Sequence, residues 1–148
     1  MKVTIYIDGG ARGNPGPAAA GIVIADGDGT PLRESGVYIG EATNNVAEYT
    51  GLVRALEAAV ALEATEVEAF SDSELVVKQM AGEYRVKNKG LIPLFEDASY
   101  FSKQFESFSL THVRREKNVK ADALVNMAID CRKDIGDELI PSDDEDEQ

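Results

Sequence analysis

The chain has 148 residues, which is enough for one domain of ordinary size with a single hydrophobic core. Its formal net charge of -12 and pI near 4.4 argue, taken alone, against a protein that binds nucleic acid by general electrostatic attraction. The hydrophobic content of 43% is typical of a soluble globular protein. Because no run approaches the roughly 20 apolar residues of a membrane span and the N-terminus lacks the apolar core of a signal peptide, we expect a cytoplasmic protein with no membrane contact.

Three β-strands are predicted first along the chain. Residues 2–8 alternate and are rich in β-branched and aromatic side chains, and they end at the turn-forming run GGARGNPGP. A second apolar run covers residues 18–25, the Asp-Gly-Asp-Gly of residues 26–29 is a hairpin signal, and a third strand is expected at residues 32–39. We therefore expect these strands to pair antiparallel.

The pattern then changes to that of a long amphipathic helix. From residue 46 to residue 62 the apolar side chains recur at spacings of three and four, and Thr43 or Asn44 is available as the N-cap. A short strand is predicted at residues 66–71, followed by a helix over residues 72–82. A helix between two strands implies a crossover connection and parallel pairing.

The last third of the chain completes an α/β pattern. Residues 83–90 form a polar, basic connection, and residues 91–105 predict a third helix. A fifth strand is expected at residues 108–113 and a final helix at residues 119–132. The predicted order of elements is βββαβααβα.

The charge distribution predicts one domain and an acidic tail. Residues 137–148 contain seven acidic residues and no basic one, so residues 1–136 carry a formal charge of only -5. We expect residues 1–136 to form the domain and residues 137–148 to be a disordered tail, because this acidic run has little apolar surface to bury. The single Cys131 cannot form an internal disulfide and is expected to be an ordinary packed residue.

Four acidic residues stand where carboxylates are not expected for stability. Asp8 ends the first strand, Glu48 lies in the first turns of the long helix, Asp72 follows the fourth strand, and Asp122 sits between alanines in the last helix. If the first and fourth strands are neighbours, Asp8 and Asp72 lie side by side, where α/β sheets usually place their sites. The other reading is that Asp8 begins a turn, that Asp72 caps its helix, and that Glu48 and Asp122 are solvated.

A cluster of these four carboxylates would require cations. Two carboxylates about 5 Å apart repel by roughly 3 kcal/mol at an effective dielectric constant of about 20. Oxygen ligands without a His or Cys cluster favour Mg²⁺ or Mn²⁺ over Zn²⁺. Two such ions about 4 Å apart would suit an in-line phosphoryl displacement.

Four segments together resemble the type 1 ribonuclease H family. They are DGGARGNPGPAAAG, TNNVAEYTGLVRAL, SDSELVVKQM and REKNVKADALVNMA, in the order and on the elements of that family. The resemblance implies an RNase H-like fold, with a mixed five-stranded sheet in the order 3-2-1-4-5 whose second strand is antiparallel. It also implies endonucleolytic, two-metal-ion cleavage of the RNA strand in RNA/DNA hybrids, leaving 3′-hydroxyl and 5′-phosphate ends. The implied metal ligands, for Mg²⁺ or as a substitute Mn²⁺, are Asp8, Glu48, Asp72 and Asp122.

The resemblance also implies substrate contacts. Asn14 and Asn44 correspond to residues that reach the minor groove of the hybrid, Asn45 is a further candidate for this contact, and Thr43 is a candidate phosphate contact. A short amide can donate to and accept from a 2′-hydroxyl, the group that marks the RNA strand. The alternative from the residues alone is that Asn14 is a turn residue before Pro15 and Asn44 an N-cap.

The sequence departs from the family pattern in two places. The loop before the last helix lacks the His that many members carry, so Arg115 or Glu116 is expected to substitute, and the sole histidine, His112, is read as structural. The connection after Gly82 has no extra helix and no extended basic loop. Basic residues near these two segments, Lys87 and Arg114 among them, are expected either to line a nucleic-acid-binding face or to be scattered solvated charges; they are Lys78, Arg85, Lys87, Lys89, Arg114, Arg115, Lys117 and Lys120.

Two other functions remain open at this point. One is a nuclease of the same fold that also cleaves double-stranded RNA, which the shortened connection allows. The other is a catalytically silent module that binds hybrids or a protein partner. No protein partner is evident from the sequence, and a monomer is expected.

Overall fold

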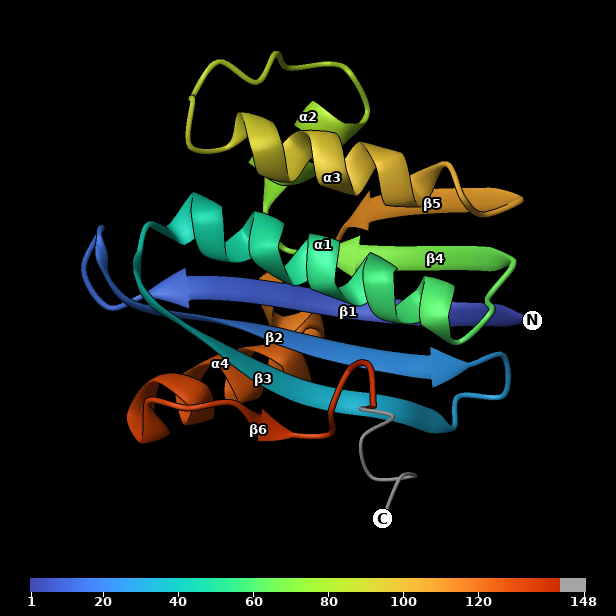
Figure 1. The fold of residues 1–148 in the computed structure, drawn as a ribbon, viewed down its shortest axis with the longest axis horizontal. Coiled ribbons are helices and arrows are strands. Elements are labelled where there is room, and N and C mark those ends of the chain that lie inside the picture. The colour runs from blue at the N-terminus through green and yellow to red at the C-terminus, as the bar shows by residue number, and fades with distance from the viewer. Residues whose placement is uncertain (142–148) are drawn as a thin grey trace.

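The computed structural model describes residues 1–141. These residues form a mixed β-sheet with helices on both of its faces (Figure 1). The strands are β1 (Lys2–Ala11), β2 (Gly16–Asp26), β3 (Pro31–Ala42), β4 (Glu66–Ser71), β5 (Ser107–His112) and β6 (Ile135–Gly136). The helices are α1 (Asn44–Ala61), α2 (Glu74–Met80), α3 (Ile92–Ser102) and α4 (Val119–Cys131), and a short 3₁₀ turn covers Arg115–Lys117.

The strand order confirms the predicted arrangement and adds one strand to it. The order is β5-β4-β1-β2-β3-β6, in which β1 pairs antiparallel with β2 and parallel with β4. The prediction of five strands was wrong by β6, which pairs with Ser35 and Gly36 of β3. A strand of two residues is too short to produce an alternating pattern, so nothing in the sequence marks it.

The alternation of side chains along β2 divides the apolar interior into two layers. Ala20, Ile22 and Ile24 point into the large core, which β1, β4 and helices α1 and α3 complete. Ala19 points the other way, into a smaller cluster with three side chains of α4: Val125, Ala128 and Ile129. Helix α4 therefore covers the face of the sheet opposite to α1.

The C-terminal segment packs further than predicted. Leu139 is 5% exposed and belongs to the large core, and Asp137 accepts a hydrogen bond from the backbone N–H of Glu34 at 2.9 Å. The packed domain thus continues past the boundary expected at residue 136, because the expectation weighed the acidic residues and overlooked Leu139. The rest of the predicted tail, residues 142–148, lies outside the described residues.

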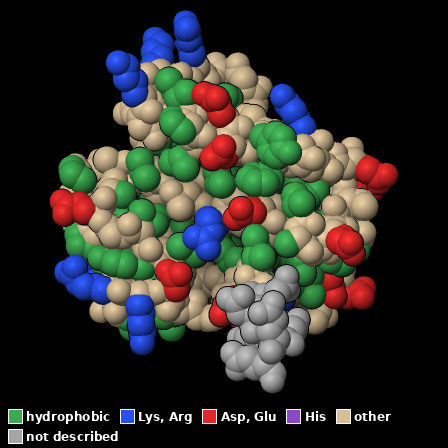
Figure 2. Space-filling view, viewed as in Figure 1, with side chains coloured by type: hydrophobic (Ala, Val, Ile, Leu, Met, Phe, Trp, Pro, Cys, Tyr) green, Lys and Arg blue, Asp and Glu red, His purple; other side chains and the backbone are tan. Residues whose placement is uncertain are grey.

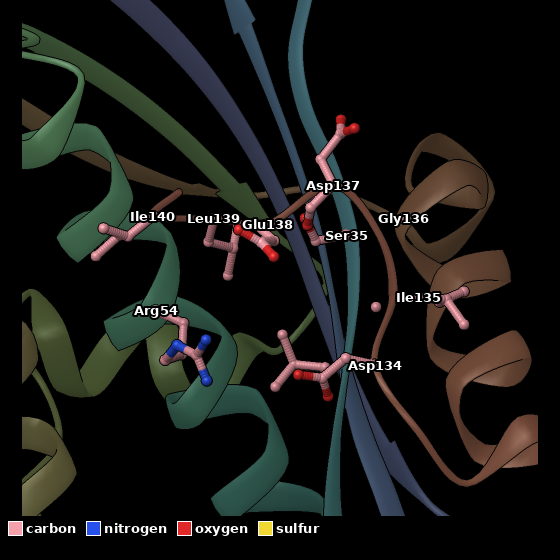
Figure 3. A pocket seen from close by; sticks show the side chains of 11 residues that line it. Ser35, Arg54, Asp134, Ile135, Gly136, Asp137, Glu138, Leu139 and Ile140 are labelled. Atoms are coloured by element: carbon pink, nitrogen blue, oxygen red, sulfur yellow. The ribbon is translucent and has the colours of Figure 1, made fainter. Parts of the chain in front are cut away.

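A pocket of about 430 Å³ lies between this segment and α1. Figure 3 shows Arg54 of α1 facing the segment that carries Glu138, Leu139 and Ile140. None of the four candidate carboxylates lines this pocket.

Cys131 is exposed at the C-terminal end of α4, so the expectation of a packed residue was wrong. Among residues 1–141, no helix combines the length and the apolar character that crossing a membrane requires.

Candidate active site

Strands β1 and β4 bring Asp8 and Asp72 to the same place in the sheet. The parallel pairing of β1 with β4 ends at Ile7 and Ser71, and the two aspartates are the residues that follow. The expectation that Asp8 ends its strand was wrong, because β1 continues to Ala11 with β2 as its remaining partner. Asp72 does not cap α2: Ser73 is the N-cap, and its hydroxyl accepts the N–H of Val76 at 3.3 Å.

Helix α1 brings Glu48 next to Asp8 through a close approach at Gly9. A Cβ atom at Gly9 would lie 2.4 Å from the backbone nitrogen of Glu48, so only glycine allows the helix to pack this closely on β1. The helix begins at Thr43, whose hydroxyl accepts the N–H of Val46 at 3.2 Å. Glu48 therefore points from the second turn of α1 into the site and is 9% exposed.

Helix α4 brings Asp122 from the other face of the sheet. A Cβ atom at Gly21 would lie 2.0 Å from the carbonyl oxygen of Ala121, so α4 rests directly on β2 beside Asp122. Asp8, Glu48 and Asp122 then line one cavity of about 400 Å³. The structure thus brings all four predicted carboxylates to one site.

Three of the carboxylates form a compact group. One oxygen from each of Asp8, Glu48 and Asp72 lies within 4.8 Å of the others. Asp8 accepts the N–H of Gly9 at 2.9 Å, whereas Oε2 of Glu48 is buried without a hydrogen-bond partner among the described residues. A buried carboxylate oxygen without a donor is costly unless a cation or a proton is present.

The electrostatics of the group agree with its geometry. Burial, followed by the charge of Asp72, raises the pKa of Asp8 to about 8. Burial, followed by the charges of Asp8 and Asp72, raises the pKa of Glu48 well above its usual range, and Arg115 partly opposes this. In the absence of cations, protons therefore take up part of the negative charge at neutral pH.

The donor set fits a divalent cation of the Mg²⁺ or Mn²⁺ class. All of its atoms are carboxylate oxygens, Oε2 of Glu48 has no other partner within the described part of the chain, and the raised pKa values mark a surplus of negative charge. No His or Cys belongs to the group, which disfavours Zn²⁺.

The two residues expected to substitute for the loop histidine differ in their position relative to the cavity. Nε of Arg115 is 3.9 Å from Oδ2 of Asp72, and Arg115 lines the cavity although its side chain is 87% exposed. Glu116 is exposed in the 3₁₀ turn and is not part of the cavity lining. His112, which was expected inside the fifth strand, is the last residue of β5 and is exposed beside Ser71.

The candidate substrate-binding asparagines are connected to each other. Oδ1 of Asn14 accepts the N–H of Asn44 at 2.9 Å, and Oδ1 of Asn44 accepts the N–H of Ala11 at 2.8 Å. These bonds orient both side chains with the oxygen toward the protein. No hydrogen bond from either amide NH₂ group to residues 1–141 is found, so both groups are available as donors. Asn45 is exposed in the first turn of α1.

Sequence reasoning missed the residue that holds this loop in place. Arg12 donates to Asp130 at 2.5 Å and reaches Asn126, so the loop that carries Asn14 is anchored to α4. A single arginine in a glycine-rich turn looks like a solvated charge, and only the fold shows its partner.

The remaining basic candidates lie outside the cavity. Lys87 and Arg114 are exposed and do not line it. Figure 2 shows several Lys and Arg side chains over the connection between α2 and α3, and a mixture of basic and acidic side chains over the rest of this view. The connection itself contains no helix, as predicted.

Comparisons with known proteins find relatives that are similar to this chain in sequence. A reverse transcriptase-like family matches residues 6–128. A bifunctional protein of Mycobacterium tuberculosis is 49% identical over 132 residues, which are 88% of this chain and 36% of that protein. A ribonuclease HI of Halobacterium salinarum is 45% identical over 129 residues, which are 87% of this chain and 65% of that protein. The chain thus spans about a third of the first relative and just under two thirds of the second.

Solved structures of related proteins are also similar to this chain. The N-terminal RNase H domain of a Mycobacterium tuberculosis protein superimposes with a TM-score of 0.85 at 48% identity, covering 87% of this chain and 99% of that domain. LC11-RNase H1, determined in complex with an RNA/DNA hybrid, gives a TM-score of 0.81 at 48% identity, covering 88% of this chain and 98% of that one.

Proposed function

Because the chain belongs to the type 1 ribonuclease H family, we propose that it hydrolyses the RNA strand of RNA/DNA hybrids as an endonuclease. The products would carry 3′-hydroxyl and 5′-phosphate ends. The observation that carries the proposal is the group of Asp8, Glu48 and Asp72 within 4.8 Å, with Asp122 on the wall of the same cavity. A silent binding module would have no need of this buried negative charge.

Asp8, Glu48, Asp72 and Asp122 are proposed to hold two Mg²⁺ ions, or Mn²⁺ in their place. When bound, the ions supply an activated water and stabilise the leaving oxygen. The protein contributes the placement of the four carboxylates by two strands and two helices. Arg115 stands at the mouth of the cavity, where its positive charge can attract a phosphate group.

Recognition of the RNA strand is assigned to the linked asparagines. Because the oxygens of Asn14 and Asn44 accept backbone N–H groups, their NH₂ groups are the part offered to the substrate. We therefore expect them to donate to acceptors of the minor groove, the 2′-oxygen included. Thr43, Asn45, Lys87, Arg114 and Glu116 remain predicted contributors, and the cytoplasmic location, the monomeric state and activity on double-stranded RNA remain predictions as well.

One experiment tests the function. Labelled RNA/DNA, RNA/RNA and DNA/DNA duplexes are incubated with the protein and either Mg²⁺ or Mn²⁺, alongside Asp72→Asn and a matched control, Asp97→Asn, on the exposed surface of α3. The proposal expects cleavage of the hybrid that Asp72→Asn abolishes and Asp97→Asn leaves intact. Cleavage of RNA/RNA at a similar rate would favour the broader nuclease, and no cleavage with either metal would refute the proposal.

A further inference from the structure

Asn118 is a buried polar residue that the proposed chemistry does not use. It lies between the 3₁₀ turn and α4, and it is 2% exposed. Its side-chain Nδ2 donates to the carbonyl oxygen of Ile7 at 2.7 Å, across 111 positions in the sequence. An asparagine before a helix usually caps it, yet the side chain of Asn118 makes no cap hydrogen bond to α4. Its amide is therefore committed to β1 rather than to its own helix.

The two partners of Asn118 stand next to two of the candidate ligands. Ile7 immediately precedes Asp8, at the last position where β4 pairs with β1. On the other side, the main-chain carbonyl of Asn118 accepts the N–H of Asp122 at 3.1 Å, which closes the first turn of α4. One residue thus contacts the strand beside Asp8 with its side chain and the helix at Asp122 with its backbone.

We infer that Asn118 is a positioning residue that sets the place of Asp122 relative to Asp8. The apolar cluster of Val125, Ala128 and Ile129 restrains the middle of α4, and the close approach of Ala121 to Gly21 sets the distance of its first turn from β2. The hydrogen bond of Asn118 adds a link from this turn to β1 beside Asp8, and because it is directional it constrains both distance and angle. The consequence for catalysis rests on the proposed function, whereas the structural part of the inference does not.

The test compares Asn118→Ala and Asn118→Asp with a control that weakens the fold elsewhere. Val3→Ala serves as the control, because Val3 is fully buried near the start of β1, where that strand pairs with Asp26. Two readouts are used: amide hydrogen exchange of residues 122–125 relative to α1 in metal-free protein, and kcat and KM for hybrid cleavage with Mg²⁺.

For Asn118→Ala we expect exchange at residues 122–125 to accelerate more than in α1, and kcat to fall by about tenfold or more, since a displacement of about 1 Å can cost up to about 100-fold. KM should stay within about threefold, because the inferred role of Asn118 is to place Asp122 and not to contact the hybrid. Asn118→Asp should be at least as severe, since its carboxylate cannot donate to Ile7. Val3→Ala should not accelerate exchange at residues 122–125 more than in α1, because Val3 packs in the core on the α1 side of the sheet, and it should leave kcat unchanged.

Two results would overturn the inference: exchange at residues 122–125 that changes only as much as in α1, or a kcat of Asn118→Ala equal to that of Val3→Ala. If Asn118→Ala does not fold, Asn118→Gln keeps the donor one methylene further out and should still lower kcat at an unchanged KM. A wild-type protein that cleaves no hybrid would refute the proposed function alone, and the exchange measurement would still decide the placement of α4.

Discussion

At the scale of single residues, the buried carboxyl group of Asp8 has a strongly raised pKa. It is 6% exposed, and its pKa is raised to about 8 first by burial and then by the charge of Asp72. In the unfolded chain the same group titrates near 3.8. Between these two values the folded state binds a proton that the unfolded state releases.

The proton bound by Asp8 makes the stability of the metal-free protein depend on pH. A group that binds more protons in the folded state destabilises that state as the pH rises, so Asp8 should lower the free energy of unfolding of the metal-free protein between pH 4 and pH 8. Asp8→Asn removes this loss and should stabilise the metal-free protein above pH 8 by a few kcal/mol, since one pKa unit corresponds to about 1.4 kcal/mol.

Urea unfolding in EDTA at pH 5 and at pH 9 measures the effect. The informative quantity is the difference between wild type and Asp8→Asn at each pH, because other carboxyl groups contribute to both curves. Asp97→Asn, on the exposed surface of α3, should leave this difference near zero. A larger stabilisation by Asp8→Asn at pH 5 than at pH 9 would contradict the prediction.

At the scale of elements, the packing of α4 on β2 contributes to the position of Asp122 together with the hydrogen bond of Asn118. Gly21→Ala would place a methyl group 2.0 Å from the carbonyl oxygen of Ala121, so the helix has to move. We expect the free energy of unfolding to fall by about 1–3 kcal/mol, as for other overpacked sites, and kcat to fall because Asp122 moves with the helix. Urea unfolding and steady-state cleavage measure the two effects.

The turn between β2 and β3 offers a matched control. A Cβ atom at Gly27 would meet no heavy atom within 4 Å, so Gly27→Ala should change stability little and leave kcat unaltered. Equal stabilities and rates for the Gly21→Ala and Gly27→Ala proteins would show that α4 does not depend on this close approach.

Some features of the fold and of the site could be predicted from the sequence, and others could not. The rule that neighbouring parallel strands bring their ends to one edge made Asp8 and Asp72 candidates, and the resemblance to the type 1 ribonuclease H family then favoured the site over the alternative reading. Asn118 was missed because its partner, Ile7, is 111 positions away and a lone Asn before a helix resembles a cap. Leu139 was missed because the acidic composition around it outweighed one apolar residue. Periodic patterns were therefore predictable, and single long-range contacts were not.

At the scale of the whole molecule, the C-terminal segment closes the sheet edge at β3. The hydroxyl of Ser35 donates to the carbonyl oxygen of Asp137 at 2.6 Å, and Leu139 joins the core. Deleting residues 137–148 should lower the free energy of unfolding by about 3–5 kcal/mol, from one buried leucine and hydrogen bonds worth about 1 kcal/mol each. Deleting residues 142–148 should change it by less than about 0.5 kcal/mol. Urea unfolding of the two truncated proteins decides this, and equal losses would contradict it.

The truncated proteins also separate the effect of the C-terminal segment on folding from the effect of its charge on nucleic-acid binding. Removal of residues 142–148 deletes five acidic residues and changes the formal charge from -12 to -7, while every described contact stays in place. If the basic groups around the site contact phosphates, the less acidic protein should bind an RNA/DNA hybrid more tightly at low salt, in EDTA to prevent cleavage. The gain should shrink as the salt concentration rises, because the Debye length falls to about 8 Å at 0.15 M. Fluorescence anisotropy from 20 mM to 300 mM salt measures the affinity of each protein for the hybrid. A difference of about 0.8 in the slope of log affinity against log salt corresponds to one phosphate contact. A gain that persists at high salt would point to a direct contact of the deleted residues with the binding face, rather than to their charge at a distance.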